Sequence, residues 1–115
     1  HLATGRYDDA LASFAAAHGV SRLAGWDAGE AAALANLGNV HLDCDRLDEA
    51  AEHYAAALEL DRRHGRRAGE AGQLANLALV QGLRGQLQLS ADNLGAALAL
   101  HRRIGSRVSE AFSEP

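Results

Sequence analysis

Three side chains of types that bind metal ions lie close together in the sequence: His41, Cys44 and Asp45. Zinc is held by a closed tetrahedral set of ligands, or by an open site with an ordered water. No second cluster with ligand spacing occurs in the chain. A His and a Cys at a helix end more often pack against the protein or face solvent. We therefore expect no metal and no cofactor.

The sequence also lacks the patterns that mark catalytic sites. It offers no nucleophile with a neighbouring base, no paired-carboxylate cleft and no glycine-rich phosphate loop. Its 12 glycines fall at expected turns and at close helix crossings. We predict that the protein is not an enzyme.

Two asparagines stand forty positions apart in the same local sequence, Leu-Ala-Asn-Leu, at Asn36 and Asn76. An amide side chain offers both a donor and an acceptor, which suits contact with the backbone of a bound peptide. The alternative is that each amide caps or braces a neighbouring helix. The choice depends on the elements that position the two side chains.

Those elements follow from an internal repeat of forty residues. About 17 of 40 positions are identical when residues 34–73 are placed on 74–113, and about 14 of 33 when 1–33 are placed on 41–73. Such a period predicts a solenoid of stacked units. We predict one array over 1–115: the second helix of a truncated first repeat (1–27), two full repeats (28–67 and 68–106) and the start of a further helix (107–115). The array is expected to be either a window cut from a longer one or a truncated one.

An all-α fold is expected because Ala and Leu dominate and the single Pro is the last residue. The pattern predicts about five helices, over 7–23, 28–42, 47–64, 68–83 and 86–104, with a C-terminal stub from 107. Asp27 is expected to be an N-cap, with Glu30 completing an acidic variant of the capping box. Position 45, matched by Gly5 and Gly85, should have a left-handed backbone.

Small residues are expected where two helices approach closely. Gly38 and Ala50 should face each other across a helix pair, with Tyr54, Ala57 and Leu58 also turned inward. A large side chain at either small residue would force the helices apart.

The charge pattern argues against several partners. The net charge is −4, acidic and basic residues are mixed along the chain, and no basic stripe is present. We therefore expect no nucleic acid and no membrane surface as partner. A single cysteine and the lack of a long apolar run fit a reducing compartment, and we expect a cytoplasmic location.

The inward residues of the second copy, Leu37-Gly38, Leu47, Ala50, Tyr54 and Ala57, resemble the signature of the tetratricopeptide repeat family. The first copy matches in its second half, and the third copy is looser, with Leu77-Ala78, Ser90 and Leu94. The resemblance implies a right-handed α-solenoid of antiparallel helix pairs. The forty-residue length is similar to the long repeats of G-protein-signalling modulator scaffolds, kinesin light chains and bacterial regulators.

This resemblance implies a protein–protein interaction scaffold, often used in signalling, that binds a peptide or partner protein in its concave groove. A terminal carboxylate is not the expected ligand, because Ala35 and Ala75 stand where a basic residue would be needed. The groove residues carried over by position are Ala32, Ala35, Asn36, Asn39, Asp43, Gly72, Ala75, Asn76, Leu79 and Leu83. Leu79 replaces the Asn39 of the preceding copy, so the groove should be more apolar at that end.

Other interpretations stay open on the sequence alone. The array could be a sensory or regulatory segment of a larger bacterial transcription or signalling regulator. A homodimer through exposed terminal helices is a further hypothesis. Trp26 could anchor a partner or cover the core between repeats. The Arg doublets at 62–63, 66–67 and 102–103 could form a basic ridge, although neighbouring acids favour a surface of mixed charge.

Overall fold

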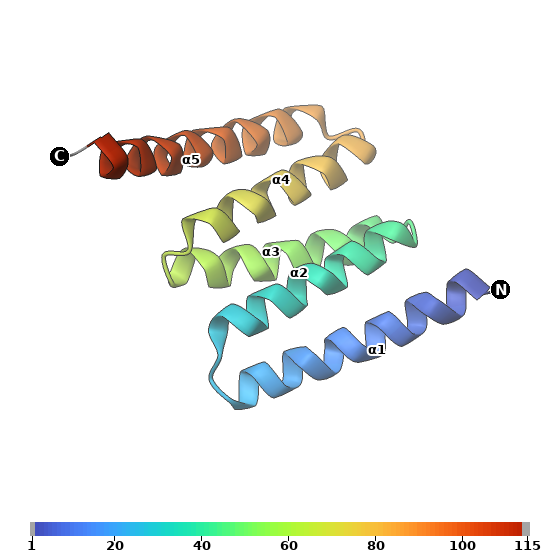
Figure 1. Cartoon of the computed structure of the whole chain (residues 1–115). Helices are drawn as coiled ribbons and strands as arrows, with labels where there is room; N and C mark the ends of the chain where they lie inside the picture. Colours follow the sequence, from blue (N-terminus) through green and yellow to red (C-terminus); the bar gives the residue numbers. More distant parts are fainter. Residues whose placement is uncertain (1, 114–115) are drawn as a thin grey trace.

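The computed structural model describes residues 2–113, which fold into five consecutive α-helices. These are α1 (Leu2–Leu23), α2 (Asp27–Asp43), α3 (Leu47–Arg63), α4 (Arg67–Leu83) and α5 (Leu87–Ser113). Each helix packs against the next one, and the chain measures 57 × 38 × 23 Å (Figure 1). No strand occurs within residues 2–113. The expected all-α solenoid is confirmed.

The forty-residue period is visible in the helix boundaries. Helices α2 and α4 begin at positions 27 and 67 and both contain 17 residues, while α3 and α5 begin at 47 and 87. Of the expected helices, those over 28–42, 47–64 and 68–83 differ from the observed ones by no more than one residue at each end. None of the helices within residues 2–113 is long and apolar enough to cross a membrane.

The turns between helices share one backbone geometry. Asp45 has φ +61 and Gly85 has φ +78, so the predicted left-handed conformation is confirmed at these positions. The amide of Arg46 donates to the carbonyl of His41 at 2.8 Å, which is the bond that closes a Schellman motif at a helix C-terminus. Gly5 does not share this role, because it lies inside α1.

The predicted capping box of α2 is wrong. Helix α2 begins at Asp27, the cap position is Trp26, and no side chain caps the helix. Both carboxylates instead bond to histidines of neighbouring helices or turns: Glu30 to His18 at 3.0 Å, and Asp27 to His64 at 3.1 Å. Contacts with other segments have thus displaced the local capping interaction, although both acids still favour the positive end of the helix.

The hydrophobic core lies between α3, α4 and α5, and α2 packs against it through Leu42. Ala50, Tyr54 and Ala57 are fully buried, and Leu58 nearly so, as predicted. The close approach at Gly38 involves a different partner from the expected one: the atoms nearest to a Cβ at this position would be those of the Tyr54 ring, at 2.7 Å, and not Ala50. Glycine is needed there because the aromatic ring occupies the space of a side chain.

Helix α5 is longer than expected. The sequence predicts an end near Ile104 and a separate stub from 107, but α5 continues through Gly105 to Ser113. At the equivalent point in α3, Gly65 ends the helix, and an ion pair of 2.8 Å joins Asp61 to Arg66 across the turn. The corresponding residues in α5 are His101 and Ser106, which cannot form this pair. The ion pair of the Gly65 turn thus has no counterpart in α5, although the turn at Gly25 also forms without it.

Candidate peptide-binding groove on α2 and α4

All ten residues expected in the groove are at least partly exposed, and they lie on two helices, α2 and α4. Helix α3 packs against both of these helices and so sets their spacing. The predicted residues on α2 are Ala32, Ala35, Asn36, Asn39 and Asp43, and those on α4 are Gly72, Ala75, Asn76, Leu79 and Leu83. Their use as a ligand surface stays a prediction.

Asn36 and Asn76, half-buried on these two helices, differ in their hydrogen bonds. The Asn76 amide donates to Oε1 of Gln73 at 3.3 Å, one turn earlier on the same helix. Within residues 2–113, the Asn36 side chain forms no hydrogen bond. Asn36 therefore keeps its full donor and acceptor capacity for a ligand, whereas Asn76 keeps part of it.

Asn39 has a structural partner that the sequence did not reveal. The Tyr54 hydroxyl donates to Oδ1 of Asn39 at 2.5 Å, which ties α3 to α2. Burial, and secondly the charge of Asp43, raise the pKa of Tyr54, so this hydroxyl keeps its proton at neutral pH. Asn39 is exposed as a residue, but its side-chain oxygen is held by this bond to Tyr54.

The α4 end of the candidate groove contains an apolar hollow of about 380 Å³. Three predicted residues line it, namely Ala75, Leu79 and Leu83, and the latter two are about half exposed. The sequence missed the other lining residues: Ala78, Gly82, Ser90 and Leu94. The repeat alignment could have predicted this hollow. Leu94 stands where the previous copy has the larger Tyr54, and the smaller side chain leaves space.

The Trp26 side chain packs against the start of α2 and is also largely exposed to solvent. A Cβ at Gly29 would collide with the Trp26 ring, so this ring lies directly against the first turn of α2. The residue is nevertheless 63% exposed. The ring therefore covers the start of α2 rather than a buried inter-repeat core, and a role as an anchor for a partner stays a prediction.

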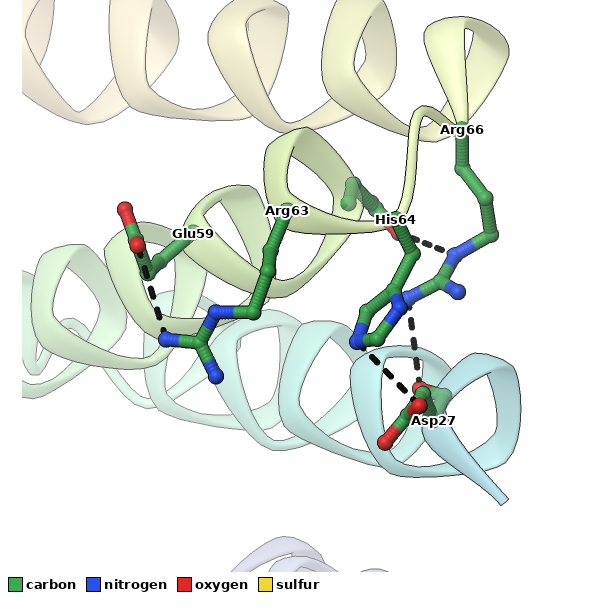
Figure 2. A network of polar contacts seen from close by, with 6 residues as sticks. Asp27, Glu59, Arg63, His64 and Arg66 are labelled. Atoms are coloured by element: carbon green, nitrogen blue, oxygen red, sulfur yellow. Dashed lines mark hydrogen bonds and ion pairs between the residues drawn. The ribbon is translucent and has the colours of Figure 1, made fainter. Parts of the chain in front are cut away.

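The polar network around the α3–α4 turn is structural (Figure 2). Asp61 is almost fully buried and accepts a hydrogen bond from Nε of Arg66 at 2.8 Å. Arg66 also donates to the backbone carbonyl of Asp27 at 3.4 Å, where the Asp27 carboxylate meets His64. Three helices are thereby joined at one point.

Surface charges near this turn are mixed, as one of the two sequence interpretations expected. Arg62 and Arg67 both contact the carboxylate of Glu70, at 3.2 and 3.3 Å. Arg63 contacts Glu59 at 3.5 Å, and both of these side chains are more than half exposed. Such an exposed pair contributes little stability. No free basic ridge exists at positions 62–67.

The three metal-binding residue types do not gather into a site. Within residues 2–113, no group of three His, Cys, Asp or Glu side chains could hold a metal ion. The His41 ring instead stacks on His53 of α3, with ring centroids 4.9 Å apart. Nδ1 of His41 is buried without a hydrogen-bond partner. Burial, and next the charges of His53 and Arg46, lower the pKa of His41 from its ordinary value of 6.5.

This histidine pair should make the stability of the chain sensitive to pH. Because the folded pKa of His41 is lowered, the unfolded chain takes up a proton first as the pH falls. The contribution of neutral His41 to the free energy of unfolding is therefore complete above about pH 6.5 and is lost as the pH falls through the lowered folded pKa. Urea unfolding measured between about pH 5 and about pH 8 should show this loss.

The next repeat supplies a matched control for the histidine pair. Gln81 and Asn93 occupy the equivalent positions and are joined by a hydrogen bond of 2.9 Å that does not titrate. The double variant H41Q/H53N should therefore lose less stability on acidification than the unmodified chain. His18 and His64 are present in both proteins, so their contributions cancel in the difference. Equal losses in the two proteins would contradict the assignment.

Comparison with known proteins agrees with the repeat analysis. Residues 31–64 match the family model of the tetratricopeptide repeat. The matched segment runs from Ala31 in α2 to the end of α3, and it includes Gly38 and Tyr54. No curated protein matches the chain. Residues 31–64, which lie within the five consecutively packed helices, are thus similar to one tetratricopeptide repeat.

Proposed function

We propose that the chain is a protein-interaction scaffold that binds a peptide or a partner protein along the exposed face of α2 and α4. Tetratricopeptide repeats are in general interaction modules, and residues 31–64 match that family. The observation that carries the proposal is the combination of the unbonded Asn36 amide on α2 with the apolar hollow at Leu79 and Leu83 on α4. Amides bind an extended backbone, and the hollow accepts an apolar side chain.

The proposal includes the long, forty-residue type of repeat, as in signalling scaffolds. Its support is the identical length and forty-residue offset of α2 and α4. A regulatory segment within a larger bacterial regulator would use the same surface against another domain of its own chain. Self-association through a terminal helix stays a prediction, supported by the half-exposed Leu94 and Leu98 of α5.

The test begins with the selection of a ligand from random sequences. A displayed library of random 12-residue peptides is selected on the chain, and the affinity of the enriched peptides is measured by calorimetry. The double variant Asn36→Ala/Asn76→Ala should weaken binding about tenfold, the value expected for the loss of one or two hydrogen bonds. Leu79→Asp should abolish the binding of any peptide whose enriched sequence contains an apolar anchor.

Glu52→Ala provides a matched surface control, because Glu52 is exposed on α3 and lies outside the candidate groove. Its affinity for the same peptides should be unchanged. If the asparagine variant and the Leu79 variant bind as tightly as the unmodified chain, the groove assignment is wrong.

A further inference from the structure

A second hollow lies at the opposite end of α4 from the apolar one, between the start of α4 and the C-terminal half of α5. It encloses about 340 Å³. Arg67 lines it from α4, and Leu100, Arg103, Ile104 and Arg107 line it from α5. The hollow depends on the unexpected length of α5, since three of its lining residues, Ser106, Arg107 and Glu110, lie beyond the point where the repeat predicts a turn.

The hollow has an apolar base and a basic rim. Leu100 is buried, and Ile104 is half-buried, so both present hydrocarbon surface. Three guanidinium groups stand around them; that of Arg67 contacts the carboxylate of Glu70 at 3.3 Å, and Glu110 adds a carboxylate to the lining. Arg103 and Arg107 are four positions apart and therefore lie on one face of α5, where their like charges repel each other.

The pairing of these arginines sets them apart from the arginines near the α3–α4 turn. Arg62, Arg63 and Arg66 all contact carboxylates at 2.8 to 3.5 Å. Apart from Glu110, which lines the same hollow, no carboxylate within residues 2–113 pairs with Arg103 or Arg107. Their planar donor groups therefore remain available for an anionic oxygen supplied by another molecule.

We propose that this α4–α5 hollow is a second binding site, separate from the groove, for an acidic peptide segment of a partner. A Glu or Asp carboxylate would bond to Arg103 and Arg107, and a neighbouring apolar side chain would cover Leu100 and Ile104. Charge complementarity favours an acid over a neutral residue, and the apolar base favours a peptide over a small inorganic anion. The site extends the binding surface from the α2–α4 face to the far end of α5.

The test is a titration of the ¹⁵N-labelled chain followed by NMR, which detects weak binding and reports arginine Nε–Hε signals directly. The probe is the blocked peptide Ac-Glu-Leu-Glu-Leu-NH2. We expect saturable shifts at Arg103, Arg107 and the amides of 100–110. The neutral peptide Ac-Gln-Leu-Gln-Leu-NH2 should bind at least about tenfold more weakly, the loss of one charge-assisted pair.

Matched charge variants distinguish binding in this hollow from non-specific electrostatic attraction between the acidic peptide and the chain. R103Q/R107Q should weaken binding of the acidic peptide at least about tenfold, whereas R22Q/R102Q, with the same change in net charge at exposed positions outside the hollow, should bind it unchanged. Thermal unfolding followed by circular dichroism verifies that both variants fold. Equal weakening in the two variants would overturn the proposal.

Two further titrations decide the nature of the ligand and the independence of the site. If inorganic phosphate produces the same shifts and prevents peptide binding, while Ac-Glu-Gly-Glu-Gly-NH2 binds as well as the leucine peptide, the hollow is a simple anion site and the proposal is wrong. The groove variant Asn36→Ala/Asn76→Ala should still bind the acidic peptide. If the acidic peptide does not bind in the α4–α5 hollow, the test of the α2–α4 groove is unaffected. If the groove assignment is wrong, the test of the hollow is likewise unaffected.

Discussion

Replacing Gly38 with Ala should lower the free energy of unfolding by about 2 kcal/mol, a large effect for one methyl group. A Cβ at this position would lie 2.7 Å from Cε1 and 2.8 Å from Cδ1 of Tyr54. The ring has little room to move, because it is fully buried and its hydroxyl is bonded to Asn39. Overpacking therefore outweighs the gain of up to about 1 kcal/mol that Ala brings to a helix. Urea denaturation measures the net change.

Gly95 in α5 provides the control for the effect of glycine itself. No atom lies within 4 Å of a Cβ built at Gly95, so Gly95→Ala should stabilise the chain by about 0.5 to 1 kcal/mol. If Gly38→Ala stabilises the chain by a similar amount, the close contact with Tyr54 is not what requires glycine.

The third copy shows how the same contact can be made without glycine. There Ala78 and Leu94 occupy the positions of Gly38 and Tyr54, and both line the apolar hollow. Tyr54→Leu should therefore cost less in the Gly38→Ala background than in the unmodified chain. We expect a coupling energy of about 1 kcal/mol from the double-mutant cycle. Strictly additive effects would show that the two residues do not constrain each other.

Most of the fold could be predicted because the period, the turn residues and the inward positions agree with one another. The predicted helix over 28–42 lies within one residue of the observed one at each end, since left-handed residues flank it at 25 and 45. Burial of Ala50 and Tyr54 followed from helical spacing alone. These features depend on neighbours that are close in sequence, or on a pattern that repeats.

The errors concern side-chain contacts that local rules did not include, and helix ends that differ between copies of the repeat. Local capping rules placed Asp27 at an N-cap, but His64, from the next turn along the array, attracts its carboxylate. The repeat placed a turn at Gly105, but a turn there would lack the ion pair that spans the Gly65 turn. Equivalent positions in a repeat can therefore differ in structure where their partners differ.

The candidate sites follow the same rule. The sequence predicted which residues of α2 and α4 are exposed, because exposure follows helical spacing. It did not predict the two hollows, which appear where α5 departs from the repeat: Leu94 is smaller than Tyr54, and residues 105–113 continue the helix. The places where the third copy has drifted are thus the places where space for a ligand exists.

Removing the Arg66 side chain should cost more stability than any other truncation of a charged residue in this region. Asp61 is 3% exposed, and its Oδ1 is 2.8 Å from Nε of Arg66. In Arg66→Ala a buried carboxylate would keep no charged partner, and we expect a loss of about 3 kcal/mol in the free energy of unfolding. Arg66 retains some exposure, which places the value at the low end for buried pairs.

Arg63→Ala is the matched control, because it removes the same type of side chain from an exposed pair with Glu59. Its cost should be about 0.5 kcal/mol or less. If the two variants lose equal stability in urea denaturation, the buried pair does not hold the α3–α4 turn.

The preceding turn provides a replacement for the whole pair. Ser21 and Trp26 occupy the positions of Asp61 and Arg66, and Ser21 is also buried. Gly29 and Gly69 are equivalent in the repeat, and each leaves space for a side chain of its turn. A Cβ at Gly69 would lie 2.5 Å from Oδ2 of Asp61, and a Cβ at Gly29 would collide with the Trp26 ring.

The double variant Asp61→Ser/Arg66→Trp should therefore recover most of the stability that Arg66→Ala loses. Gly69 leaves space for the indole, and no buried charge remains without a partner. The triple variant that adds Gly69→Ala should lose this recovery, because the methyl group would occupy the place of the ring. A double variant no more stable than Arg66→Ala would mean that the side chains of the two turns are not interchangeable. The ion pair would then be needed for the stability of α4, and not for the geometry of the turn.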